Sequence, residues 1–71
     1  MIYVTVMTYG SYEDDGEFTD ENVYVGLDYD LARLKARENF DSNQENNDFC
    51  YGVVQHWNDE GTMLKAETII K

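Results

Sequence analysis

The chain has 71 residues, with fifteen Asp and Glu against five Lys and Arg and a formal net charge of −10. Its length allows one domain with one modest core, expected over residues 1–71. Its 42% hydrophobic residues are typical of a folded chain. We expect no membrane span and no cleaved leader, and a single Cys cannot form an internal disulfide. Composition therefore excludes membrane proteins, disulfide scaffolds and basic nucleic-acid binders.

A strand is predicted first, over Ile2–Tyr9, because this segment is rich in β-branched and aromatic residues. The acidic segment 13–16 ends in Asp-Gly, a favoured hairpin turn, and a second strand is expected within 17–25, most clearly at 23–25. Alternation along the first strand predicts one face with Ile2, Val4 and Val6 and another with Tyr3, Thr5, Met7 and Tyr9.

A helix is expected from Tyr29 to about Phe40, where good helix formers follow one another without Gly or Pro. Asp28 precedes it as a suitable N-cap. Residues 41–48 are polar and predict a loop. A stripe with two alanines lets a helix approach a sheet closely, so we expect it to be the buried face. The stripe consists of Tyr29, Ala32, Ala36 and Phe40, which leaves Leu31 and Leu34 at the margin of the core or exposed.

Two further strands are predicted at Phe49–Trp57 and Thr62–Ile70, joined by the turn 58–61 with Gly61 where a left-handed residue is needed. The expected fold is therefore α+β, with the order β-β-α-β-β and one helix packed on one face of an antiparallel sheet. Alternation groups Cys50, Val54 and His56 with Leu64, Ala66 and Ile70, and Tyr51, Val53, Gln55 and Trp57 with Met63, Lys65, Glu67 and Ile69.

One helix covers only one face of such a sheet, so the other face is expected to be open. An apolar, aromatic open face is typical of an interaction surface, here a homodimer or partner interface. Two alternatives stay open: loops fold back over the face, or the face assignment is reversed by one residue. The residues predicted on this face are Tyr3, Met7, Tyr9, Tyr51, Trp57 and Met63.

No pattern of residues predicts catalysis, and we expect no catalytic residue, no cofactor, no metal and no enzyme activity. Cys50 and His56 lie six residues apart on one strand, roughly 20 Å at ~3.3 Å per residue, and so cannot pair within a chain. We interpret Cys50 as a small core residue and His56 as a strand-end residue. The spacing of the acids does not match a calcium loop, and no zinc or phosphate-binding motif is present.

The acidic side chains suggest a sharper hypothesis. Asp and Glu pair with the same arginines that bind phosphates, so closely spaced carboxylates can occupy a basic nucleic-acid-binding groove. The bases Arg33, Lys35 and Arg37 depart from a uniformly acidic surface, and form either a solvated helix face or a second contact site. The acids expected to contact a partner are Glu13, Asp14, Asp15, Glu17, Asp20, Glu21, Asp28, Asp30, Asp59 and Glu60.

The helix start at residues 28–32 with Ala36, followed by a polar loop and the strand Phe49–Trp57, carries the most specific part of a resemblance. In size, charge and element order the whole chain resembles the small acidic early proteins of bacteriophages, among them anti-CRISPR proteins and DNA-mimic anti-restriction proteins. No motif matches residue by residue, so no functional residue is carried over.

The resemblance implies a non-enzymatic inhibitor in the cytoplasm of a bacterial host. Such a protein would bind a basic, nucleic-acid-binding defence protein or complex, and would contact neither nucleic acid nor membrane itself. The alternative is a homodimeric phage accessory protein that binds a host protein through its open sheet face, with the charge serving solubility. Binding through charge should weaken steeply with ionic strength, whereas binding through the sheet face should not.

Overall fold

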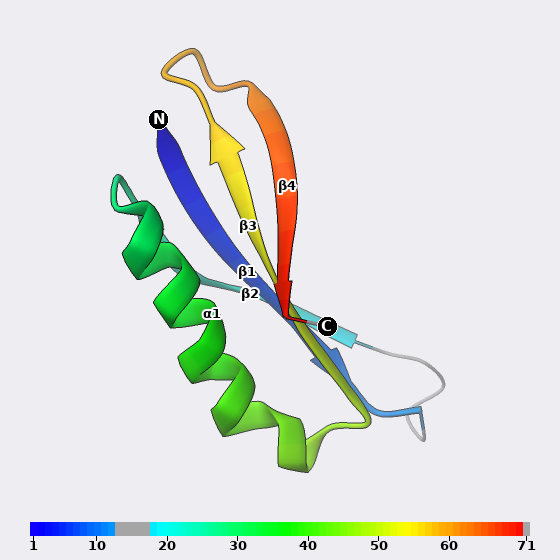
Figure 1. The fold of residues 1–71 in the computed structure, drawn as a ribbon. Helices are drawn as coiled ribbons and strands as arrows, with labels where there is room; N and C mark the ends of the chain where they lie inside the picture. Colours follow the sequence, from blue (N-terminus) through cyan, green and yellow to red (C-terminus); the bar gives the residue numbers. More distant parts are fainter. Residues whose placement is uncertain (13–17, 71) are drawn as a thin grey trace.

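The structure, a computed structural model, describes residues 1–12 and 18–70. The elements in Figure 1 follow the predicted order β-β-α-β-β, which confirms the α+β fold. The predicted turn at 13–16 lies outside the described residues. The elements are β1 (Ile2–Gly10), β2 (Phe18–Gly26), α1 (Tyr29–Asn43), the short 3-10 helix η2 (Gln44–Asn46), β3 (Phe49–Trp57) and β4 (Met63–Ile70).

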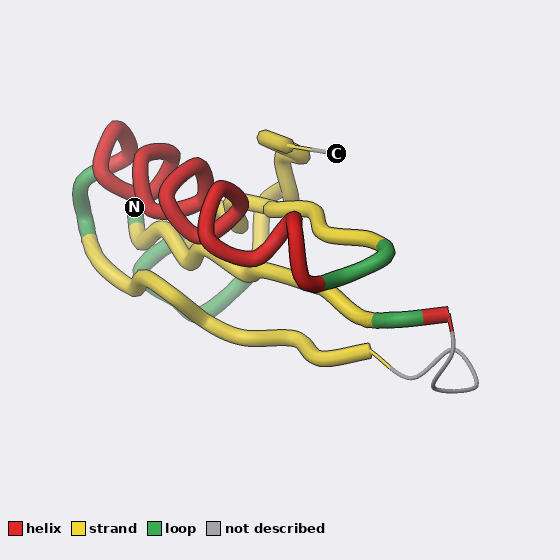
Figure 2. Tube along the Cα trace, turned by 90° about the horizontal axis from the view of Figure 1, so that it is seen from below, coloured by secondary structure: helices red, strands yellow, loops and turns green. Residues whose placement is uncertain are grey.

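The four strands form one antiparallel sheet with the order β2-β1-β3-β4. Figure 2 shows α1 along one face of this sheet, and no described helix on the other face. We call the face opposite α1 the open face. The first and last strands of the order, β2 and β4, are the edges of the sheet.

The helix is longer than predicted, because its last turns are supported by side-chain hydrogen bonds. The predicted loop at 41–48 is largely helical: α1 continues to Asn43 and η2 follows directly. The amides of Asn39, Asn43 and Asn47 each donate to the backbone oxygen four residues earlier, at 2.8 Å in every case. Regularly spaced asparagines therefore extend a helix here, where composition alone predicted a loop.

The core lies between α1 and the two central strands. Ala32 and Ala36 are fully buried, which confirms the predicted alanine stripe, and they lie against the equally buried Met7 and Val54. The hydroxyl of Thr5, also fully buried, donates to the backbone oxygen of Ala32 at 2.8 Å. The small side chains let α1 approach the sheet closely enough for a strand residue to bond the helix backbone.

The predicted face of β1 is wrong. Met7 is fully buried on the helix side, and the Tyr3 ring lies 5.2 Å from that of Tyr29 on α1. The register pairs Thr5 with Val54, so that the odd-numbered residues of β1 share the helix side with the even-numbered residues of β3. Tyr3, Met7 and Tyr9 therefore face α1, and Ile2, Val4 and Val6 lie on the open face with Tyr51, Trp57 and Met63.

The predicted faces of β4 need a similar correction. Glu67 pairs with Val54 and Lys65 with His56, which places both charged residues on the helix side, while Ala66 lies on the open face. The register shifts between His56 and Trp57, and this irregularity offsets most of β4 by one residue relative to simple alternation. Met63 still pairs with Trp57, as predicted.

The turn between β3 and β4 agrees with its prediction. Gly61 adopts a φ of +82°, a left-handed conformation that favours glycine. The side-chain oxygen of Asn58 accepts hydrogen bonds from the backbone N–H groups of Glu60 and Thr62, at 3.0 and 2.9 Å. Local turn chemistry was therefore readable from the sequence even where the strand faces were not.

Candidate partner-binding surface

All four strands contribute apolar residues to the open face. Val25 and Phe18 on β2 are 64% and 62% exposed, although both are large hydrophobic residues. Contiguous exposed apolar residues are typical of interaction surfaces. The apolar residues of the open face are Ile2, Val4, Val6, Phe18, Val25, Tyr51, Val53, Trp57 and Met63. Sequence reasoning grouped Val53 with Tyr51, Trp57 and Met63 on this face, and it placed Ile2, Val4 and Val6 on the opposite one.

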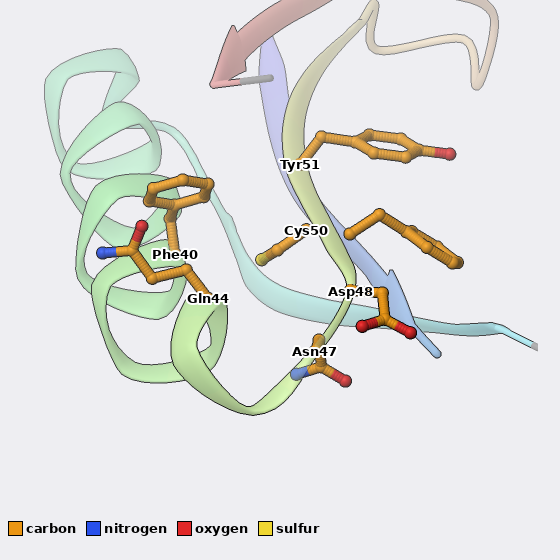
Figure 3. Close-up of a pocket in the computed structure, with 7 residues that line it drawn as sticks. Phe40, Gln44, Asn47, Asp48, Cys50 and Tyr51 are labelled. Carbon is orange, nitrogen blue, oxygen red and sulfur yellow. The ribbon is translucent and has the colours of Figure 1, made fainter. Parts of the chain in front are cut away.

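Two aromatic residues of β3 stand out on this surface. Tyr51 is exposed, and Figure 3 shows its side chain pointing away from α1, whereas the Cys50 sulfur points toward α1. The ring N–H of Trp57 donates to the Oε1 atom of Gln55 at 3.0 Å, which orients the ring on the face. Tyr and Trp are among the residue types that dominate binding energy at protein interfaces.

The Lys and Arg side chains of the described residues do not lie on the open face. Among residues 1–12 and 18–70, three of the Lys and Arg side chains belong to α1, at positions 33, 35 and 37, and Lys65 lies on the helix side of β4. Asp20 pairs with Thr8 and so lies on the open face, where it accepts a hydrogen bond from the Thr8 hydroxyl at 2.5 Å. Among the described residues, the open face therefore carries the acid Asp20 and no Lys or Arg side chain.

Several of the predicted contact acids already have partners within the fold. Glu21 accepts from the Tyr9 hydroxyl at 2.8 Å, and Asp28 caps α1 by accepting from the backbone N–H of Leu31 at 3.1 Å. Asp59 lies 3.7 Å from the N-terminal ammonium group. Asp30 and Glu60 are exposed. Glu13, Asp14, Asp15 and Glu17 lie outside the described residues.

The described acids do not form one continuous row. Figure 1 shows the start of α1 and the turn 58–61 at the same end of the molecule, near the N-terminus. Asp28, Asp30, Asp59 and Glu60 thus gather at this end, whereas Asp20 and Glu21 lie on the edge strand β2. The described carboxylates therefore form separate groups, at one end of the molecule and on β2, and they do not trace a single phosphate-like track.

A second cluster, on the helix side, was missed by sequence reasoning. His56, only 7% exposed, packs against the rings of Tyr3 and Tyr29, at centroid distances of 5.1 and 5.4 Å, and these two rings also contact each other. The Tyr29 hydroxyl donates to Glu67 Oε1 at 2.5 Å, and His56 Nε2 lies 3.4 Å from the same oxygen. The hydrogen bond between the Tyr29 hydroxyl and Glu67 raises the pKa of Tyr29 and lowers the pKa of Glu67. The cluster joins α1 to the edge strand β4.

The lowered pKa of Glu67 predicts a pH-dependent stability. Because the Tyr29 hydrogen bond favours the carboxylate in the folded state, its contribution is present above the unfolded-state pKa of about 4.3 and is lost as pH falls through the lower folded-state value. Tyr29→Phe should therefore destabilise the protein at neutral pH and progressively less toward pH 3. Thermal melts of both proteins between about pH 7 and 3 measure this. A difference independent of pH would contradict the assignment, and Tyr12→Phe serves as the exposed control.

A hollow lies between the end of α1 and the start of β3. Its volume is about 370 Å³, and Figure 3 shows Phe40 and Gln44 on one side of it and Cys50 and Tyr51 on the other. Burial raises the pKa of the half-buried Cys50 thiol, which favours its neutral form. The residues that line the hollow are Phe40, Gln44, Asn47, Asp48, Phe49, Cys50 and Tyr51.

Residues 1–12 and 18–70 contain neither a candidate metal site nor a helix suited to crossing a membrane. No three His, Cys, Asp or Glu side chains in these ranges are grouped as a metal ion would need. None of the helices there is long and apolar enough to cross a membrane. The expected lack of enzyme activity, metal and cofactor stays a prediction.

Comparison of the chain with protein-family models, with curated proteins and with solved structures finds no match. The resemblance to small phage proteins therefore stays a hypothesis.

Proposed function

We propose that the protein is a non-enzymatic inhibitor that binds a basic, nucleic-acid-binding surface of a bacterial defence protein. The observation that carries the proposal is the open face, which is apolar, aromatic and free of Lys and Arg side chains in residues 1–12 and 18–70. A positively charged partner docking there would meet apolar anchors and the carboxylate of Asp20, and no Lys or Arg side chain of residues 1–12 and 18–70. The bases of α1 lie on the other side of the sheet.

Charge and apolar contact have different roles in this proposal. The net charge of −10 would attract a basic partner and raise the rate of encounter. Most of the affinity would come from a few buried aromatic anchors, for which Tyr51 and Trp57 are the best placed. The partner is excluded from its nucleic acid because the same basic surface cannot bind both.

The exposed aromatic residues also support a second candidate, a homodimeric accessory protein that binds a host protein through the open face. Two copies meeting there would bury Tyr51 at the centre of the contact. A Tyr51→Glu substitution would then leave an unpaired charge in an apolar interface and dissociate the dimer. The same −10 charge on both copies opposes this arrangement, which is why we place it second.

The test uses two purified defence complexes with basic DNA channels as probes, an RNA-guided nuclease loaded with its guide and a restriction endonuclease. The protein should prevent labelled duplex DNA from binding at least one of them, and less effectively as ionic strength rises. Tyr51→Ala should weaken inhibition by about 30-fold, corresponding to the loss of one interface hot spot. Leu34→Ala, an exposed leucine on the far side of α1, is the matched control. Inhibition equally sensitive to both substitutions would contradict docking through the open face.

A further inference from the structure

The strand β4 forms an edge of the sheet whose outer side is not covered by another described strand. Most of its side chains are exposed, including Leu64 at 54%. An exposed edge strand is a ready template for pairing with another strand. The charges along β4 indicate which strand would pair with it.

The opposite edge, β2, is poorly suited to pairing with itself. Within Phe18–Gly26 it carries Asp20 and Glu21 and no base, so a second β2 adds repulsion without any opposite charge. In contrast, β4 carries one Lys and one Glu, Lys65 and Glu67, and so has no net charge in a chain of −10. Edge-to-edge contact between two copies meets least repulsion at β4.

The regular part of β4 is short and carries one charge of each sign. Register irregularities flank the stretch Lys65–Thr68, which pairs evenly with β3. Lys65 and Glu67 are two residues apart and project to the same, helix side of the sheet. Among the described residues, Lys65 forms no ion pair within 4.0 Å, so its ammonium group is available to a second copy.

Symmetry limits the registers that two such strands can adopt. A two-fold axis perpendicular to the sheet keeps both helices on one side and places one residue of β4 opposite itself. Centring on Lys65 or on Glu67 sets like charges opposite each other, which is unfavourable. Centring on Ala66 sets Lys65 opposite Glu67 of the second copy twice, and Leu64 opposite Thr68.

We propose that two copies pair through β4 in the antiparallel register centred on Ala66. The two four-stranded sheets then join into one, and the two open faces become one longer surface. This dimer leaves Tyr51 and Trp57 accessible, so it differs from a dimer formed through the open face. It does not depend on the proposed function.

The first test is a charge-swap experiment read by sedimentation at micromolar concentration and physiological salt. The wild-type protein should sediment at twice its 8.3 kDa. Lys65→Glu alone and Glu67→Lys alone should each be monomeric, because each places like charges opposite each other. An equimolar mixture of the two variants should recover the dimer, since both cross-strand pairs are then complementary. Lys35→Glu on α1, with the same change of charge, should leave the dimer intact.

A second measurement avoids Glu67, which also holds Tyr29 in the fold. In a Cys50→Ser background, Ala66→Cys should form an intermolecular disulfide under mild oxidation, because residue 66 lies opposite itself. Thr68→Cys should form one far more slowly. A monomeric wild-type protein, equal cross-linking at 66 and 68, or a dimer dissociated by Tyr51→Glu and not by Lys65→Glu would each overturn the proposal.

Discussion

Replacing Met7 with alanine is expected to lower the free energy of unfolding by about 2–5 kcal/mol, the usual cost of removing a large buried side chain. Met7 is fully buried between β1 and α1, where its neighbours cannot close the space left behind. A 71-residue domain has a total stability of only about 4–11 kcal/mol, so the variant should be largely unfolded near physiological temperature.

Met63→Ala is the matched control, because the sequence predicted both methionines on the same open face. Met63 lies there and is exposed, so its truncation should cost less than about 1 kcal/mol. Urea denaturation followed by circular dichroism measures both. Equal losses of stability would contradict the burial of Met7 and the exposure of Met63.

Gly52→Val is expected to destabilise the fold by about 1–3 kcal/mol through overpacking. A Cβ atom at this position of β3 would lie 2.9 Å from the Met7 sulfur and 3.2 Å from the Ala36 Cβ. Valine otherwise favours strands, so the expected loss comes entirely from the close approach of α1. Thr68→Val, an exposed β4 position, is the control and should change stability by less than about 0.5 kcal/mol.

A second substitution, at Ala36, tests whether the loss at Gly52→Val comes from overpacking against α1. Ala36→Gly removes the Cβ atom that faces Gly52, so the double variant with Gly52→Val should be more stable than the two separate losses predict. Residues in contact typically show such non-additivity, by roughly 0.5–3 kcal/mol. Strict additivity of the two losses would mean that valine destabilises the strand for a reason unrelated to the helix.

The sequence predicted the element order well, because composition and turn chemistry change clearly along the chain. It did not predict which face of β1 packs against the helix, because alternation divides the residues of a strand between two faces without indicating which face is buried. Both sets in β1 are largely apolar, so polarity could not decide between them. Gly52 agrees with the predicted faces of β3, because a glycine inside a strand often marks close approach and this one places the helix over the even-numbered residues. The face of β1 then follows only from its register with β3.

Other parts of the candidate site depend on contacts that local patterns do not encode. The hydrogen bond between Tyr29 and Glu67 joins residues 38 positions apart, and it requires the shifted register of β4. A register irregularity is a property of the assembled sheet, and the sequence of β4 alone does not predict it. Tyr51, Trp57 and Met63 were placed on the open face as predicted, because β3 alternates regularly and Met63 pairs directly with Trp57.

An accessible open face in negative surroundings is tested most directly by fluorescence quenching of Trp57, the single tryptophan of the chain. Acrylamide should quench it readily, and at equal ionic strength caesium should quench it more strongly than iodide, because the net charge of −10 and the exposed Asp59 and Glu60 of the adjoining turn attract the cation and repel the anion. A tryptophan shielded from all three quenchers, or one quenched better by iodide than by caesium, would contradict the account.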